Sequence, residues 1–166
     1  MEHICGRPLG LRFDQKSDKL YIADAYMGLV IVGPEGGLAT KVATESQGIP
    51  FGLTNGLDID QRSGVVYFTH SGWRYRRRNC ISAIVSGDKT GRPMKYDPKS
   101  KETTALLENL IFPNRVALSK DGYFILIADT TNCKILRLWL KSSKLRIVED
   151  FAHLLGFPNN IRRNLK

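Results

Sequence analysis

The sequence predicts an all-β protein made of repeated four-stranded antiparallel units, and three observations lead to this prediction. The first is an internal repeat, carried by four similar stretches: "RPLGLRFD" (7–14), "LTNGLDID" (53–60), "FPNRVALS" (112–119) and "FPNNIRRN" (157–164). The second is that apolar and polar residues alternate in the first three stretches, with the period of two that is typical of a half-buried strand. The third is that a polar turn and a second apolar strand follow each of these three.

Each of the three units reads as four strands in the same order. The turns after the first strand are "DQKSDK", "DQRSG" and "SKDGY". The second strands are "LYIAD", "VYFTH" and "LIADT", and the third and fourth candidates are "GLVIVG" with "LATKVAT", "RPMKYDP" with "TTALLEN", and "KILRLWL" with "LRIVEDF". Four short strands in a unit of roughly 40–50 residues predict the blades of a β-propeller. We place the units at about 7–52, 53–111 and 112–156, with the start of the next at 157–166.

The middle unit is longer than its neighbours. When Gly10, Gly56, Arg115 and Asn160 are taken as equivalent, the successive spacings are 46, 59 and 45 residues. We expect the insertion in 70–89, with a short helix around Cys80–Val85. A propeller ring closes with at least four blades, so about three units predict a partial propeller domain over residues 1–166. The alternative is a self-contained β-sandwich of about twelve short strands.

Composition indicates one soluble globular domain. The chain has 166 residues, of which 42% are hydrophobic and 25% charged. No apolar run reaches the roughly 18 residues of a membrane span, so we expect no transmembrane segment. The net charge of +9 is scattered and accompanies no nucleic-acid motif. It therefore favours a solvated basic surface over a nucleic-acid or anionic-membrane interface. The cysteines and histidines lack metal spacing, and the common catalytic motifs are absent.

Three asparagines, Asn55, Asn114 and Asn159, share one repeat position at the entry to the innermost strand. In a propeller this position lies near the central channel, so the three side chains should converge. Amide oxygens are suitable ligands for Ca²⁺, which takes six to eight oxygens, although carboxylates are needed as well. The alternative is that each asparagine caps a turn. Leu9 occupies the same position in the first unit, so the fold itself does not require asparagine there.

Longer stretches of the chain resemble the plant strictosidine synthase-like family. They are "CGRPLGLRFD", "LYIADAYMGLVIVGPEGGLATKVATE", "TNGLDIDQRSGVVYFT", "SGDKTGRPMKYDPKSKETTALLENLIFPNRVALSKDG" and "GFPNNIRRN". The resemblance covers essentially the whole chain and implies a six-bladed β-propeller that acts on a small-molecule substrate. The founding member condenses tryptamine with secologanin. Many relatives resemble calcium-dependent esterases and lactonases, in the wider group that includes paraoxonase and gluconolactonase-type propellers.

The resemblance implies a metal site in this sequence, and it identifies no catalytic residue. Asn55 and Asn114 match calcium ligands of the hydrolase relatives. Most family members read "FPDN" at the fourth repeat, whereas this chain reads "FPNN", so Asn159 replaces a carboxylate and Asn160 is retained. We expect Asn55, Asn114, Asn159 and Asn160 to be metal-site residues, with Ca²⁺ binding weakened by the loss of a charge. His70 stands where the family has an aspartate, and we interpret it as a surface or channel histidine without a proton-transfer role.

The resemblance begins in the second blade of the family and ends on entering the fifth. The first-blade metal Glu and the later-blade catalytic Glu of the family fall outside this sequence, and so does the cysteine that pairs with the residue matching Cys5. We therefore expect Cys5 to be unpaired and the chain to be truncated. The family implies the vacuole or secretory pathway, whereas an N-terminus without a signal peptide implies the cytoplasm if the chain is complete.

Three functions stay open at this stage. The first is a calcium-dependent ester or lactone hydrolase, truncated and inactive alone. The second is an alkaloid-forming synthase, which needs a glutamate as general base. The glutamates lie in predicted turns or outer strands: Glu35, Glu45, Glu102, Glu108 and Glu149. The third is a non-catalytic propeller fragment whose exposed blade edges favour self-association.

Overall fold

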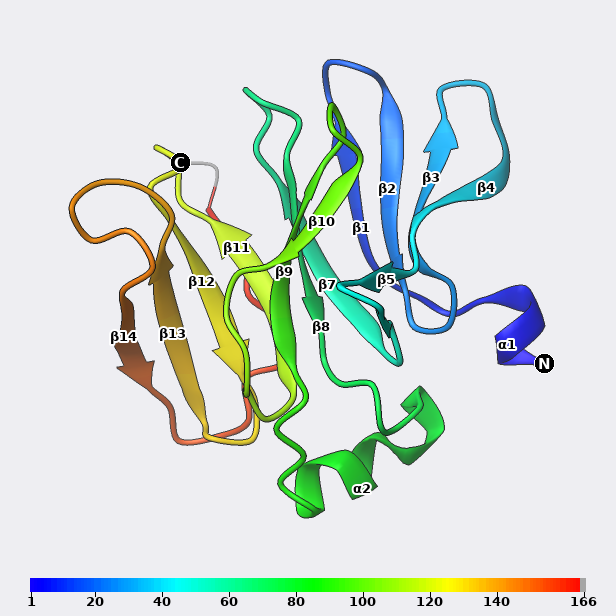
Figure 1. Cartoon of the computed structure of the whole chain (residues 1–166). Coiled ribbons are helices and arrows are strands. Elements are labelled where there is room, and N and C mark those ends of the chain that lie inside the picture. Colours follow the sequence, from blue (N-terminus) through cyan, green and yellow to red (C-terminus); the bar gives the residue numbers. More distant parts are fainter. Residues whose placement is uncertain (165–166) are drawn as a thin grey trace.

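Three four-stranded antiparallel sheets stand side by side in the computed structural model, which describes residues 1–164 without the side chain of His3 (Figure 1). The first sheet contains β1 (Pro8–Asp14), β2 (Lys19–Asp24), β3 (Gly28–Gly33) and β4 (Gly36–Ala43). The second contains β7 (Thr54–Ile59), β8 (Val66–His70), β9 (Arg92–Asp97) and β10 (Glu102–Ala105). The third contains β11 (Pro113–Leu118), β12 (Phe124–Asp129), β13 (Lys134–Trp139) and β14 (Val148–His153).

Each sheet follows chain order from an innermost to an outermost strand, so the sheets are propeller blades and the predicted fold class is confirmed. The predicted start of a fourth unit, 157–166, carries no strand up to residue 164, and its last two residues lie outside the described range. None of the helices within residues 1–164 is long and apolar enough to cross a membrane.

The loop after β8 carries the predicted helix α2 (Cys80–Val85), preceded by a 3₁₀ turn at Arg77–Asn79. Two elements were not predicted: the N-terminal helix α1 (Glu2–Cys5) and a small hairpin of β5 (Glu45–Ser46) and β6 (Ile49–Pro50). These are only two to four residues long, too short to show a periodic pattern.

Two apolar layers hold the three blades together. The layer between the first and second blades includes Tyr21, Leu29, Phe68 and Met94. The layer between the second and third blades includes Tyr67, Val116, Ile125, Ile127 and Leu138. Burial of such side chains contributes about 1.5–3 kcal/mol each relative to exposure. The middle blade is therefore covered on both faces, and the arrangement excludes the β-sandwich alternative.

Glycines allow the innermost strands to approach closely. A Cβ built on Gly10 would lie 2.7 Å from the carbonyl oxygen of Asn55, and one built on Gly56 would lie 2.9 Å from the Cα of Arg115. These two glycines occupy the same repeat position, so the same close contact recurs between successive blades. The Asn55-Gly56 pair consequently lies inside β7 and does not form a hairpin turn.

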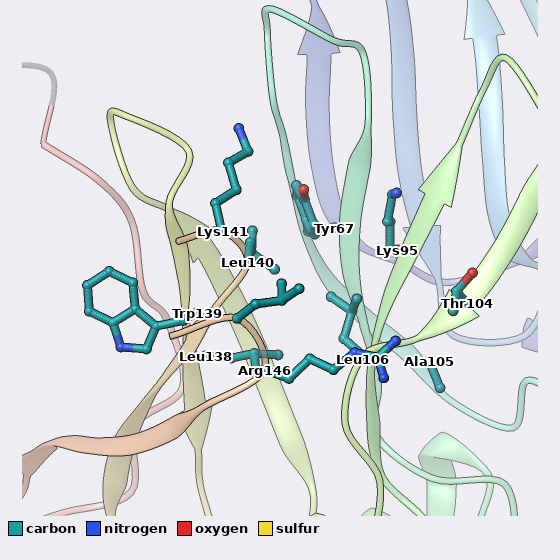
Figure 2. A pocket seen from close by; sticks show the side chains of 11 residues that line it. Tyr67, Lys95, Thr104, Ala105, Leu106, Leu138, Trp139, Leu140, Lys141 and Arg146 are labelled. Atoms are coloured by element: carbon teal, nitrogen blue, oxygen red, sulfur yellow. The ribbon is translucent and has the colours of Figure 1, made fainter. Parts of the chain in front are cut away.

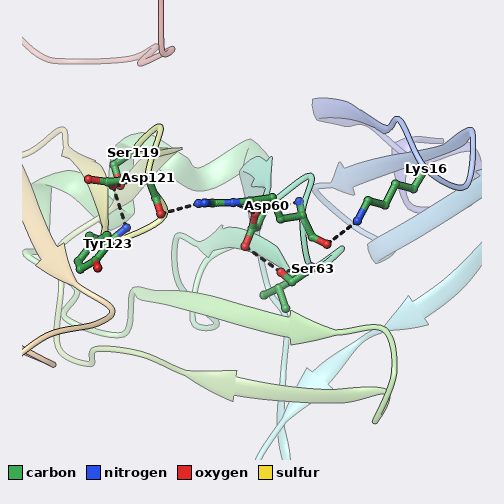
Figure 3. Close-up of polar contacts among 8 residues, drawn as sticks. Lys16, Asp60, Ser63, Ser119, Asp121 and Tyr123 are labelled. Carbon is green, nitrogen blue, oxygen red and sulfur yellow. Dashed lines mark hydrogen bonds and ion pairs between the residues drawn. The ribbon is translucent and has the colours of Figure 1, made fainter.

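The hairpin turns that follow the innermost strands are linked to one another, and we call these links the turn ladder. The Lys16 Nζ donates to the carbonyl oxygen of Arg62 over 2.6 Å, and the Arg62 guanidinium donates to the carbonyl oxygen of Asp121 (Figure 3). Lys16, Arg62 and Asp121 lie in the turns of the first, second and third blades. Each turn is also closed internally, for example by Ser63 donating to the Asp60 carboxylate over 2.9 Å.

Candidate functional site

Two of the predicted metal-site asparagines, Asn55 and Asn114, lie where innermost strands begin. The pairing of β7 with β8 is irregular between Thr54 and Leu57, and that of β11 with β12 is irregular between Pro113 and Val116. Asn55 and Asn114 lie within these two irregular segments. Both are buried, with exposed fractions of 6% and 7%. Both therefore lie at equivalent places at the entry to neighbouring strands.

Hydrogen bonds hold the two amides through their nitrogen atoms. The Asn55 Nδ2 donates to the Ser71 Oγ over 3.4 Å, and Ser71 donates in turn to the Pro113 carbonyl oxygen over 2.7 Å. The Asn114 Nδ2 donates to the Asn159 Oδ1 over 3.0 Å. Because both amides use Nδ2 as the donor, their oxygens remain as the atoms suited to a cation. Asn55, Asn114 and Asn159 are thus joined in one connected group through Ser71 and the start of β11.

Asn160 lies outside the connected group of the other three asparagines. Like Asn159 it is exposed, and it lines a cavity of about 350 Å³ together with Gly10, Leu57 and Arg115. Arg12 also lines this cavity. Burial lowers the pKa of Arg115, and the charge of Arg12 lowers it further. Two guanidinium groups beside Asn160 make its surroundings less favourable to a cation than those of Asn55 and Asn114.

His70 is fully buried, so its interpretation as a surface or channel histidine was wrong. Its Nε2 accepts a hydrogen bond from the Gly52 backbone N–H over 3.0 Å, and its ring packs against Phe51 with centroids 5.1 Å apart. Burial, and then the charge of Arg92, lower the pKa of His70 to about 3. The ring is therefore neutral at physiological pH and has a packing role.

Asp24 and Asp129 end the second strands of the first and third blades, where the middle blade has His70. Both acids have a local structural role. The Asp24 carboxylate accepts backbone N–H groups of Arg7, Tyr26 and Met27. The Asn132 Nδ2 donates to both carboxylate oxygens of Asp129, to Oδ1 over 3.1 Å and to Oδ2 over 2.9 Å. Burial raises the pKa of Asp129. Both acids therefore fix the loop that follows the second strand of their blade.

The described residues contain no cluster of three His, Cys, Asp or Glu side chains that could hold a metal ion. The asparagine group fits a hard cation by donor type, because amide oxygens are calcium ligands. It supplies no negative charge. The chain thus offers an incomplete set of calcium donors.

The glutamates that a synthase would need are not on the innermost strands. Glu45 lies in β5, Glu102 in β10 and Glu149 in β14, while Glu35 and Glu108 lie in connecting segments. Glu149 is paired with Arg137 at 2.9 Å. This placement agrees with their predicted positions in turns and outer strands.

Two functional contacts had no sequence signal that we recognised. Thr69 donates to the Asn114 carbonyl oxygen over 2.7 Å, and Ser71 makes the equivalent contact to Pro113. The Thr69 hydroxyl in β8 and the Ser71 hydroxyl directly after it thus contact β11, across the boundary between blades. Their alternation at the end of a strand could have suggested a shared face, but their partner strand could not be inferred.

The three blades define part of a β-propeller. A gluconolactonase from Xanthomonas campestris superimposes with a TM-score of 0.74 over 93% of this chain and 52% of that chain, at 16% sequence identity. At that identity the likeness concerns the fold. It agrees with the propeller blades described above.

The chain belongs to the strictosidine synthase family, whose model, described as "Strictosidine synthase", matches residues 55–143. Protein STRICTOSIDINE SYNTHASE-LIKE 10 of Arabidopsis thaliana is 57% identical over 164 residues, which are 99% of this chain and 44% of that protein. Protein STRICTOSIDINE SYNTHASE-LIKE 3 of the same plant is 53% identical over 98% of this chain and 42% of its own length. The chain thus spans less than half the length of these relatives, and the family resemblance is confirmed.

Proposed function

We propose that this chain forms part of the calcium site of an ester or lactone hydrolase of the strictosidine synthase-like family. The observation that carries this proposal is the connected group of Asn55, Asn114 and Asn159, in which two amides are held through their nitrogens. The structural likeness to a gluconolactonase supports the hydrolase branch at the level of fold.

Each residue of the group has a distinct role in this proposal. Asn55 and Asn114 present their Oδ1 atoms to the cation, and Ser71 and Asn159 orient these two amides. Bound Ca²⁺ would polarise the carbonyl of an ester or lactone towards attack by water. The buried positions of Asn55 and Asn114 keep their side chains ordered, which favours binding because less conformational entropy is lost.

Calcium titration of the chain by calorimetry tests the site. We expect weak, saturable binding in the wild-type chain and binding at least about tenfold weaker in Asn55→Ala and Asn114→Ala, because each removes a ligand. Asn159→Asp should bind calcium more tightly, since it adds a charge. Asn79→Ala is the matched control, because that asparagine is exposed and makes no side-chain cap.

Hydrolysis is measured separately, on a chain extended to the length of the relatives, with an aryl ester and a lactone as substrates. We expect calcium-dependent turnover that Asn55→Ala abolishes. The proposal is wrong if the extended chain neither binds calcium nor hydrolyses either substrate. Binding without hydrolysis would retain the metal site and reject the hydrolase assignment.

A further inference from the structure

A groove opens between the second and third blades, away from the innermost strands. It has a volume of about 340 Å³, and we call it the outer groove (Figure 2). β8, β9 and the end of β10 form one wall, and β13 with the segment after it forms the other. The residues that matter below are Tyr67, Lys95, Leu106, Lys141, Leu145 and Arg146.

The packing of the blades explains why the groove lies at the outside. The innermost strands touch through Gly56, whose Cβ position lies within 3.0 Å of the Asn114 carbonyl oxygen. Strands that meet so closely at the axis diverge outward, because twisted blades radiate from it. The gap between the outer strands is filled only in part by Leu106 and Leu140, which pack against the apolar layer beneath.

Leucines form the apolar part of the outer groove. Leu138 forms part of the buried layer, while Leu106 and Leu140 are half-buried. Leu145 stands at the mouth with an exposed fraction of 57%. A large aliphatic side chain in that position offers apolar surface to a ligand that has an apolar chain.

The rim of the outer groove carries only positive charge. Lys95, Lys141 and Arg146 line it, and no Asp or Glu is among its lining residues. Within residues 1–164, none of these three side chains forms an ion pair, in contrast to Lys144 nearby, which pairs with Glu149 at 3.2 Å. Lys141 is close enough to Asp60 for its charge to lower the pKa of that carboxyl. Basic side chains that form no ion pair at the edge of an apolar groove are complementary to an anionic head group.

Tyr67 adds a polar group inside the outer groove. Tyr67 is buried as a residue, with an exposed fraction of 7%, and it lines the groove. Burial raises the pKa of Tyr67, and the charges of Asp60 and Asp97 raise it further, so the hydroxyl stays protonated. The hydroxyl can therefore donate a hydrogen bond to a ligand or to water in the groove.

We propose that the outer groove binds a linear carboxylate with an aliphatic chain, the chain lying on Leu106, Leu140 and Leu145 and the carboxylate lying at Lys141 and Arg146. This ligand matches the two properties of the groove, an apolar wall and a basic rim. The site is separate from the asparagine group. Its test is therefore independent of the proposed hydrolase function.

Calorimetric titration with dodecanoate, kept below its micellar concentration, tests the proposal. We expect saturable binding to the 166-residue chain, and the double variant Lys141→Glu/Arg146→Glu should bind at least tenfold more weakly. Leu145→Gln should also weaken binding, because it removes part of the apolar wall. Dodecanol at the same concentrations should bind at least tenfold more weakly than dodecanoate, since it lacks the charge.

Lys19→Glu/Arg76→Glu is the matched control. Both residues are exposed and neither lines the outer groove, and the substitutions change the net charge by the same amount. Equal loss of affinity in this control would assign the effect to overall charge and overturn the proposal. Equal binding of dodecanol and dodecanoate, or the absence of saturable binding to the folded wild-type chain, would also overturn it.

Discussion

His70 illustrates how packing decides the chemistry of a single side chain. Gly52 donates its backbone N–H to Nε2, and Phe51 covers the ring. A protonated imidazole at this place would lose the Gly52 contact and would lie beside the Arg92 guanidinium, 3.4 Å away. The neutral form is therefore strongly favoured in the folded chain.

This burial predicts a specific pH dependence of stability. The pKa of His70 is about 3 in the folded chain and about 6.5 in the unfolded chain. The unfolded state binds more protons between these values, so its contribution to stability is present above pH 6.5 and is lost as the pH falls towards 3. We expect this group to lower the free energy of unfolding by about 2 kcal/mol between pH 7 and pH 5.

Urea denaturation at a series of pH values measures this effect. His70→Gln lacks the titrating ring while keeping a polar side chain, so its unfolding free energy should fall less between pH 7 and pH 5. The carboxylates of the chain contribute equally to the pH dependence of the unfolding free energy in the wild type and in the variant. Parallel pH profiles for the two proteins would show that His70 does not titrate as proposed.

The sequence predicted residue positions better than residue contacts. The repeat register correctly implied that Asn114 and Asn159 become neighbours, because equivalent positions in successive blades surround one axis. The burial of His70 was missed. A histidine at the end of a strand can face the channel or the layer between blades, and this depends on loop contacts such as that of Gly52.

At the scale of elements, the close contact between β7 and β11 depends on Gly56, which has no side chain. A Cβ at position 56 would meet the Arg115 Cα at 2.9 Å and the Asn114 carbonyl oxygen at 3.0 Å. Backbone atoms cannot move aside without shifting β11. The spacing of β7 and β11 is thus set by Gly56.

Gly56→Ala should therefore destabilise the chain by about 1–3 kcal/mol, the usual cost of overpacking. Gly33→Ala is the matched control, because nothing lies within 4 Å of its Cβ position and its φ is not in the left-handed region. We expect that control to be neutral or slightly stabilising, since alanine restricts the unfolded chain. Thermal unfolding followed by circular dichroism compares the two, and equal melting temperatures would contradict the proposed role of Gly56.

Innermost strands and their turns could be predicted because alternation and turn residues coincide there. Outer strands were less predictable. β10 ends at Ala105, before the end of the "TTALLEN" stretch, and β14 begins only at Val148. The latter shift arises because Arg146 donates its N–H to the Trp139 carbonyl oxygen, so the preceding residues form the turn. Long-range pairing of this kind leaves no local pattern.

At the scale of the whole molecule, Asp58 links three blades. Its Oδ1 lies 3.2 Å from the Arg12 Nε in β1, and its Oδ2 accepts the Leu118 backbone N–H in β11 over 2.9 Å. Asp58 itself belongs to β7. One carboxylate thus bridges all three innermost strands.

Asp58→Ala should lower the free energy of unfolding by about 2 kcal/mol, because it leaves the Leu118 N–H without its acceptor and the Arg12 guanidinium without its partner. The control is Asp150→Ala, which removes the more exposed pair with Lys134 and should cost no more than about 1 kcal/mol. Urea denaturation gives both values. If the two variants were equally stable, the bridge would contribute no more than a surface ion pair.

The turn ladder joins unlike sides of neighbouring blades. The first blade meets the second through Lys16, which donates to Arg62, and through Phe13, which accepts from Gln61, whereas the second meets the third through the Arg62 side chain. The middle blade therefore uses different groups on its two sides, which is the property of a heterologous, head-to-tail interface. A duplicated blade would carry both kinds of side, so it could pack against either neighbour through the kinds of contact that the chain already has. This built-in compatibility makes tandem duplication a simple route by which such a chain can gain blades.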